Sequence, residues 1–307
     1  MKRREFFSKS VIAGLGTAAY LKFGNNLPLF ANTKTAPDEI FDMAAIRGGE
    51  PDAMFDRGIK SLGGMKRFIK PNQTVVVKPN IGWDVSPERG GNTNPALVKQ
   101  IVKHCIDAGA KDVYVFDNTC DNWVRCYSNS GIEKAAKDAG AKVVPGNTER
   151  YYQSVNVPKG KRLTQAKVHE LILNSDVFIN VPILKNHGGA TLTIAMKNLM
   201  GIVWDRGYWH RNDLHQCIAD FATYRKPDLN IVDAYFVMKR NGPRGVSVED
   251  VVTMKSQIIS TDMVAVDTAA AKLFGIEPEK IGHIGLAEEL GVGITDLTKL
   301  KIDRIFI

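Results

Sequence analysis

The sequence contains 307 residues, of which 44% are hydrophobic and 24% are charged, and its formal net charge is +8. These values are ordinary for a globular protein and exclude a disordered chain, because the apolar residues suffice for a core. No apolar run reaches the roughly 18–20 residues that cross a bilayer, so we expect no membrane span in the mature chain. Basic residues are not clustered among aromatic ones, and we therefore expect no nucleic-acid partner.

The amino-terminal segment has the pattern of an export signal. The pair Arg3-Arg4 precedes two phenylalanines, and an uncharged stretch with small residues follows over 11–21. This pattern resembles the twin-arginine class, and it predicts that residues 1–31 are a signal peptide and that the mature protein is periplasmic or otherwise extracytoplasmic. Because that route carries folded proteins, a cofactor or a redox-protein partner is one expectation. The alternatives are an amphipathic helix on a cytosolic protein and an uncleaved anchor.

Strands and helices alternate through the rest of the chain. The strands are expected at 41–46, 74–78, 112–116, 142–144, 177–184, 229–232, 257–260 and 301–306. The helices are expected at 52–62, 94–108, 131–139, 190–200, 213–224, 264–274 and 278–290. This alternation predicts an α/β fold with a mostly parallel sheet and helices on both faces. We expect one domain over 32–307, in which the polar segment 149–167 is a β-hairpin insertion or a lid.

Polar residues follow four of the expected strands. They are Asn80, Asp117, the segment 185–189 and Asp233, with Asn118 and Thr119 beside the second. Ligands of open parallel sheets bind beyond the carboxyl ends of the strands, so these groups are expected to meet in one crevice.

The segment Lys185-Asn-His-Gly-Gly is the most specific of these features. Gly188 and Gly189 would let the backbone approach a ligand closely, and the helix expected at 190–200 would offer unpaired N–H groups to an anion. Lys185 adds a positive charge, and His187 is a candidate hydrogen-bond donor, acid or base. We therefore expect a small phosphate- or carboxylate-bearing ligand at this turn.

Lys197 and Asn198 would lie late on the same helix. Lys197 either reaches the ligand along the crevice wall or caps the carboxyl end of the helix near Gly201. Other ligand and catalytic motifs are missing, because the sequence contains no P-loop, no G-x-G-x-x-G fingerprint and no G-x-S-x-G nucleophile. The sequence names no cofactor.

A second polar group surrounds His210, which we expect in the loop before a helix that starts near residue 212. His210 is the other candidate for proton transfer, beside His187. A metal site formed by these two histidines with Asp213 or Asp233 is an alternative, although it lacks a closely spaced ligand pair. Surface or helix-capping roles for the histidines also remain open.

The sequence has four cysteines, which are Cys105, Cys120, Cys126 and Cys217. In an oxidising compartment they could form up to two disulfides, and Cys120 with Cys126 is the favoured pair because both lie in one loop. The alternative is that they are reduced, buried small hydrophobic residues. No C-x-x-C spacing supports a redox site or an iron–sulfur cluster.

Several of these segments resemble the bacterial and archaeal family called domain of unknown function 362. They are VVVKPNIGWD at 75–84, NTNPALVKQIV at 92–102, KNHGGATLTIAMKNLMGIV at 185–203, the region of His210 through Asp220, and DMVAVDTAAAKLFGIEP at 262–278. The resemblance implies that the following are characteristic polar positions: Lys78, Asn80, Asn94, Lys185, His187, Lys197, Asn198 and His210. Many relatives carry a ferredoxin-like segment with four cysteines. This chain lacks it, and the family implies a fold but no agreed reaction.

The sequence thus predicts an exported protein that binds a small anionic ligand or cofactor at the strand ends. Lys185, Lys197 and the Gly188–Gly189 turn would hold the anion, and Asn80 and Asn94 would orient it. His187 or His210 would carry acid–base chemistry if the protein is an enzyme. The alternatives are a non-catalytic binding or partner protein exported with a redox enzyme, and a metal-binding protein that uses the two histidines.

Overall fold

The structure is a computed structural model that describes residues 22–23, 27–28 and 39–307. The expected signal peptide therefore lies outside the described residues, except for β1 (Lys22–Phe23) and β2 (Leu27–Pro28), which form a short antiparallel pair. The first element of the main body is β3 (Met43–Arg47), and the last is β14 (Ile302–Phe306), which pairs with it in parallel.

A ten-stranded sheet runs through the molecule. Its main path has the order β14-β3-β13-β12-β9-β4-β5-β6, while β10 pairs with β12 and β11 pairs with β10. The remaining strands are β4 (Thr74–Pro79), β5 (Asp112–Val115), β6 (Lys142–Val143), β9 (Val177–Val181), β10 (Ile183–His187), β11 (Thr191–Thr193), β12 (Leu229–Met238) and β13 (Val251–Ser260). The pairs from β12 through β6 are all parallel, and β13 is antiparallel to both of its neighbours. The expected mostly parallel sheet is confirmed.

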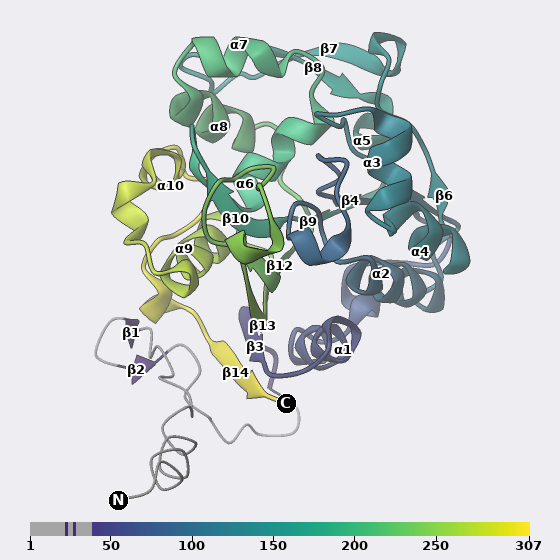
Figure 1. The fold of residues 1–307 in the computed structure, drawn as a ribbon, viewed down its shortest axis with the longest axis vertical. Helices are drawn as coiled ribbons and strands as arrows, with labels where there is room; N and C mark the ends of the chain where they lie inside the picture. The colour runs from purple at the N-terminus through teal and green to yellow at the C-terminus, as the bar shows by residue number, and fades with distance from the viewer. Residues whose placement is uncertain (1–21, 24–26, 29–38) are drawn as a thin grey trace, which may run out of the picture.

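Helices cover both faces of this sheet, as Figure 1 shows with α1 and α2 on one side and α9 and α10 on the other. The helices are α1 (Pro51–Ser61), α2 (Pro95–Asp107), α3 (Trp123–Asn129), α4 (Ile132–Asp138), α5 (Glu170–Asn174), α6 (Ala195–Asn198), α7 (Arg206–Arg211), α8 (Leu214–Ala222), α9 (Met263–Phe274) and α10 (Gly282–Glu289). Within β4, Val75 and Val77 join the core beneath α1 to α4, whereas Val76 joins the core beneath α6, α8 and α9. Because successive side chains of a strand point to opposite faces of the sheet, β4 contributes to a hydrophobic layer on each face.

Short 3-10 helices complete the chain at Met65–Arg67, Pro87–Arg89, Glu149–Tyr151, Leu199–Ile202, Val248–Asp250, Pro278–Lys280 and Leu297–Lys299. Within the described residues, no helix is long and apolar enough to cross a membrane.

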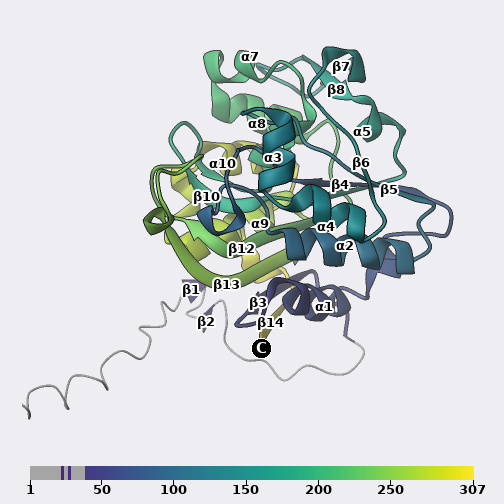
Figure 2. The same ribbon diagram turned by 45° about the vertical axis from the view of Figure 1, so that its right-hand side comes forward.

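The polar segment near residue 150 contains a separate two-stranded sheet. Strand β7 (Tyr152–Asn156) pairs antiparallel with β8 (Gln165–His169). Figure 2 shows this hairpin beside α7, at the end of the molecule away from α1 and β14. An isolated bridge between Val168 of β8 and Val203 joins the hairpin to the segment that follows α6.

The helix expected at 190–200 is wrong. Lys185, Asn186 and His187 of β10 pair with Thr191–Thr193, so Gly188 and Gly189 form the turn of a β-hairpin. Residues 191–193 form a strand instead of a helix because β12 pairs with one edge of β10, while the other edge is open to pairing with β11. The helix starts only at Ala195 and lasts four residues. The expected single strand at 177–184 is likewise interrupted at Pro182, which separates β9 from β10.

Candidate functional site

A narrow pocket lies where β4, β5 and β10 end. Its volume is about 60 Å³, which is room for a few water molecules or a small acid. The pocket collects six of the residues selected from the sequence, namely Lys78, Asn80, Lys185, His187, Lys197 and Asn198. The convergence of the strand ends is the reason that residues more than a hundred positions apart meet here.

The floor of the pocket is a buried ion pair. Lys78 Nζ lies 3.0 Å from Asp117 Oδ1, and Lys78 is only 1% exposed. Asp117 Oδ2 also accepts a hydrogen bond from the backbone N–H of Ile81 at 2.6 Å. Burial lowers the pKa of Lys78, and the charge of Asp117 opposes that shift. Gly201 borders the pair, because a Cβ at this position would overlap Asp117 Oδ1.

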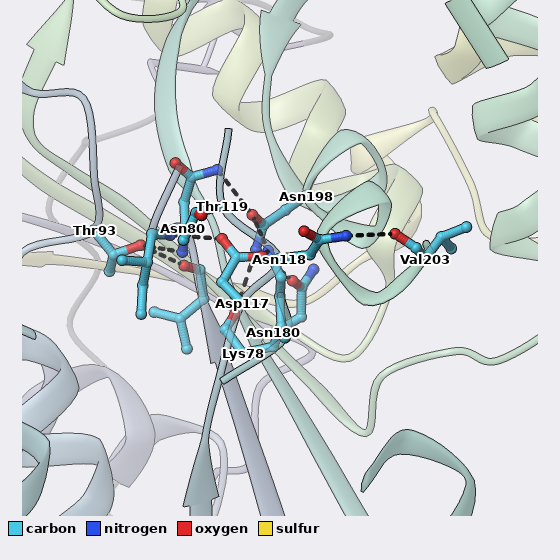
Figure 3. A network of polar contacts seen from close by, with 12 residues as sticks. Lys78, Asn80, Thr93, Asp117, Asn118, Thr119, Asn180, Asn198 and Val203 are labelled. Carbon is cyan, nitrogen blue, oxygen red and sulfur yellow. Dashed lines mark hydrogen bonds and ion pairs between the residues drawn. The ribbon is translucent and has the colours of Figure 1, made fainter. Parts of the chain in front are cut away.

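Buried amide side chains continue from this pair across the sheet, as Figure 3 shows. Asn198 Oδ1 accepts from Lys78 Nζ at 2.7 Å and from Asn80 Nδ2 at 3.1 Å. Asn198 Nδ2 donates to Asn180 Oδ1 at 2.8 Å, and Asn180 Nδ2 donates to Asn230 Oδ1 at 3.0 Å. Each amide thus uses both its donor and its acceptor, which orients the whole row.

Lys185 closes the network on the β10 side. Its Nζ donates to Asn80 Oδ1 at 3.1 Å and to the carbonyl of Gly91 at 2.6 Å. The side chain is 1% exposed, and burial lowers its pKa to about 7, with smaller effects from Lys197 and Lys78 in the same direction. Lys185 thus makes two hydrogen bonds within the protein, and Lys78 makes one hydrogen bond and one ion pair, so each ammonium group keeps one N–H of its three.

Lys197 differs from the other two lysines. Its ammonium group lines the pocket but has no hydrogen-bond or ion-pair partner within residues 39–307. Its pKa is lowered to about 8, chiefly by burial and with smaller contributions from the charges of Arg206 and Lys78. Of the two roles considered from the sequence, the side chain faces the pocket, and its helix α6 is too short for a lysine cap late on a long helix.

His187 lies on the β10 side of the pocket. Its Nδ1 accepts hydrogen bonds from the backbone N–H groups of Gly189 and Ala190, both at 3.1 Å. Burial, followed by the charges of Lys197 and Lys185, lowers the pKa of His187 to about 3. The ring is therefore neutral near pH 7 with its proton on Nε2, which makes it a hydrogen-bond donor to the pocket.

His210 stacks near His187, with ring centroids 6.3 Å apart. It belongs to α7 and not to a loop before a helix, and it is exposed. Burial of part of the ring, with the charges of Lys197 and Arg206, lowers its pKa. Of the two histidines, His210 is the one with access to solvent, and it lies beside the pocket and not in its lining.

The helix start that the sequence assigned to an anion is occupied by the protein itself. Asp267 of α9 accepts the backbone N–H groups of Ala195 at 2.7 Å and Met196 at 3.1 Å. Burial raises the pKa of this carboxyl to about 8. The free N–H groups at the start of α6 are thus satisfied, and a ligand would meet side chains instead of a helix terminus.

Asn94, Gly188 and Gly189 are not brought into the pocket lining. The side chain of Asn94 caps α2 by accepting from the backbone N–H of Ala96 at 2.9 Å. Its own N–H donates to Asp233 Oδ2 at 2.7 Å, so Asp233 supports the start of α2. Burial raises the pKa of Asp233 to about 6.

The pocket also contains residues that were not selected from the sequence. Arg206 donates to the carbonyls of Asn118 and Thr119, both at 2.8 Å, and holds the loop after β5 in place. Thr193 and Cys120 complete the wall. Asp117 and Asn118, by contrast, were expected at this crevice because they follow an expected strand, and both line the pocket. Arg206 offered no comparable signal, because it reaches the pocket from the start of α7.

The metal and disulfide alternatives find no support in the described part of the chain. Residues 39–307 contain no group of three or more histidine, cysteine or acidic side chains that could hold a metal ion. All four cysteines are free, with Cys120 exposed and the other three buried. The favoured pairing of Cys120 with Cys126 is therefore wrong, since Cys126 is packed inside α3 while Cys120 faces the pocket.

Residues 75–272 match the family described as Domain of unknown function (DUF362). The chain belongs to this family. A curated relative is a thylakoid-associated protein of Synechocystis sp., which is 27% identical over 246 residues, covering 77% of this chain and 74% of the relative. The DUF362 assignment confirms the resemblance read from the sequence.

Two solved structures are similar in part to this DUF362 protein. One is the lactate racemase apoprotein of Thermoanaerobacterium thermosaccharolyticum, with a TM-score of 0.47 and 13% identity over 86% of this chain. The other is a protein of Thermotoga maritima, with a TM-score of 0.45 and 11% identity over 78% of this chain. The chain spans 62% and 60% of the lengths of these two proteins.

Proposed function

We propose that this protein binds a small anionic ligand, phosphate- or carboxylate-bearing, in the pocket between β4, β5 and β10. The observation that carries the proposal is the excess of positive charge in a confined space. Among the described residues that line the pocket, Lys78, Lys185, Lys197 and Arg206 are cationic, and Asp117 is the one carboxylate. Burial of an unpaired ammonium group among other cations raises the free energy of the folded protein, and a bound anion would lower it.

The donors available to the ligand differ in kind. Lys197 offers its whole ammonium group, and Lys78 and Lys185 each keep one N–H beyond their bonds within the protein. His187 adds Nε2–H, and Thr193 adds a hydroxyl group on the same wall. A carboxylate or phosphate, which presents several acceptor oxygens, could use all of these donors at once.

Acid–base chemistry is a further part of this proposal. His210 is the proton-transfer candidate, because it reaches solvent and stands beside the ring of His187. His187 itself fits a fixed donor better than a base, since Nδ1 already accepts two backbone N–H groups. Absence of any turnover, together with retained anion binding, would leave a non-catalytic ligand-binding protein.

Calorimetric titration with sodium phosphate and, separately, sodium acetate tests the proposal and distinguishes the two ligand chemistries. We expect at least one of them to bind, and Lys197→Met to weaken that binding by about tenfold or more, because a charge-assisted hydrogen bond is lost. Lys134→Met is the matched control, since Lys134 lies on α4 with 80% of its side chain exposed. Equal binding by both variants, or no binding of either anion, would reject the pocket as an anion site.

Export is the second part of the proposed function. The twin-arginine pattern at Arg3-Arg4 supports it. A redox-protein partner would then be met after or during transport. Fractionation of cells that express the full chain should recover it outside the cytoplasm, and replacement of both arginines by lysine should retain it inside. Cytoplasmic recovery of the unaltered chain would reject this part alone.

A further inference from the structure

The side chain of Lys197 is presented to the pocket by a firmly held backbone. Helix α6 is anchored at its start by the Asp267 carboxylate, which accepts the N–H groups of Ala195 and Met196. On the other side of Lys197, the side chain of Asn198 is fixed by hydrogen bonds with Lys78, Asn80 and Asn180. The lysine between these anchors has no partner of its own within residues 39–307. Its backbone is fixed on both sides, while its ammonium group makes no contact that stabilises the fold. Such a lysine is positioned for a ligand.

The three lysines divide into two kinds. The side-chain nitrogen atoms of Lys78 and Lys185 are bound to acceptors within the protein, which are Asp117, Asn198, Asn80 and the carbonyl of Gly91. Lys197 has no such acceptor, and burial next to cations lowers its pKa to about 8. About one molecule in ten therefore carries a neutral amine there at pH 7. A neutral lysine amine that neighbours other cations is a nucleophile toward carbonyl carbon.

We propose that Lys197 forms an imine with a small 2-oxo acid whose carboxylate is bound by Lys185 and Lys78. This proposal rests on the anion site described above and names its substrate class. A 2-oxo acid places a carbonyl carbon directly next to the carboxylate, which suits a pocket of about 60 Å³ in which an amine stands among ammonium groups. Phosphate esters and simple carboxylates would bind there but would offer no carbonyl carbon to the amine.

The reaction balances without an oxidant or a reductant. The lone pair of Lys197 Nζ forms a bond to the carbonyl carbon, and the proton lost from nitrogen goes to the former carbonyl oxygen. That oxygen then leaves as water after it accepts a second proton, and the carbon–nitrogen double bond forms. His187 Nε2–H and the Thr193 hydroxyl group line the same pocket and are the donors available to the departing oxygen.

Reductive trapping tests the proposal on the full chain. The protein is incubated with sodium pyruvate, reduced with sodium borohydride and digested, and the peptides are analysed by mass spectrometry. We expect the peptide with Lys197 to gain the mass of pyruvic acid less one oxygen atom. Lys197→Arg, which keeps the positive charge, should lose at least nine-tenths of the trapped product, whereas Lys134→Arg should trap as the unaltered protein does. Thermal unfolding of each variant establishes that it is folded.

The outcomes separate this inference from the anion site on which it rests. Calorimetric binding of pyruvate without any trapped product at Lys197 would overturn the imine and leave the anion site standing. Trapping that is spread over exposed lysines and unchanged in Lys197→Arg would overturn it in the same manner. Failure of pyruvate, phosphate and acetate to bind would overturn both, since the imine requires the bound carboxylate.

Discussion

Lys78 Nζ lies 3.0 Å from Asp117 Oδ1, and neither side chain has more than 3% of its surface exposed. The two residues come from the ends of neighbouring parallel strands, β4 and β5, and Figure 3 shows them pointing at one another below Asn198. Removal of one partner from a buried pair leaves the other charge without compensation. The pair therefore stabilises the base of the pocket, while Lys197 in the same pocket has no partner within residues 39–307.

The first prediction contrasts these two lysines. Lys78→Met should lower the free energy of unfolding by roughly 3–5 kcal/mol, because the Asp117 carboxylate would stay buried without its cation. Lys197→Met should leave the free energy of unfolding unchanged or raise it, because it removes a buried charge that has no partner within residues 39–307. Urea denaturation of both variants measures the difference. Equal destabilisation by the two substitutions would contradict the division of roles.

Gly201 is the subject of a second prediction. A Cβ at this position would overlap Asp117 Oδ1 and lie 2.5 Å from Lys78 Nζ, so Gly201→Ala should push the ion pair apart and destabilise the fold by about 1–3 kcal/mol. Gly285 of α10 is the matched control, because a Cβ there meets no atom within 4 Å. Gly285→Ala should be neutral or stabilising by up to about 1 kcal/mol. Thermal unfolding of both variants provides the comparison, and a harmless Gly201→Ala would count against the tight packing of the pair.

The affinity for an anion should depend on pH through the lysines. The pKa values of Lys185, about 7, and Lys197, about 8, mean that both lose protons between pH 6 and 9 in the free protein. Bound anion favours the protonated forms, so affinity should be greatest near pH 6 and fall by up to about tenfold per pH unit for each lysine. His187, with a pKa of about 3, stays neutral over this range and should add no inflection to the plot of affinity against pH. Titrations at constant ionic strength check this, and an affinity that rises with pH would contradict it.

The stability of the ligand-free protein should change in the opposite direction. Both lysines have folded-state pKa values below the usual value near 10.4, so the unfolded chain binds more protons between pH 7 and 10. Their contribution to the free energy of unfolding therefore rises with pH across that interval. Lys185→Met and Lys197→Met should each flatten the rise, and a stability profile that neither variant alters would refute the lowered lysine pKa values.

Cysteine reactivity gives a further prediction for the pocket wall. Cys120 is exposed and faces the pocket, whereas Cys105, Cys126 and Cys217 are buried. Burial raises the pKa values of Cys126 and Cys217 to about 11, which further slows their reaction. Iodoacetamide should therefore label Cys120 alone in the folded protein, and an anion in the pocket should slow that labelling several-fold. Peptide mapping measures both effects, with Cys120→Ser as the control that should remain unlabelled.

The fold could be predicted to a large extent because its signals are local. Buried runs such as 74–78 and 112–116 are β-branched and end at polar residues, and they became β4 and β5 with nearly the expected bounds. The segment 190–200 failed because its strand β11 is made by pairing with β10, which is a tertiary effect that local propensity does not contain. The buried position of Asp267 in α9, which sets where α6 begins, is equally non-local.

The sequence predicted most of the residues that line the candidate site, but it did not predict how their side chains are arranged. Six selected residues share the pocket, because strand ends converge in any parallel sheet. The role expected for the glycine turn differs from its geometry, since the N–H groups of Gly189 and Ala190 donate to His187 Nδ1. Which lysine is free could not be read from the sequence at all. It depends on Asp117, Asn198 and Gly91, which reach Lys78 and Lys185 from distant segments.

The most direct measurement is the position of a heavy anion in crystals of the protein. Selenate resembles phosphate in shape and charge, and its selenium gives an anomalous signal that locates the ion. The account predicts one strong site in the pocket, within hydrogen-bond distance of Lys197 Nζ, that is absent from crystals of Lys197→Met. Selenate bound elsewhere with the pocket holding only water, or selenate retained in Lys197→Met, would contradict it.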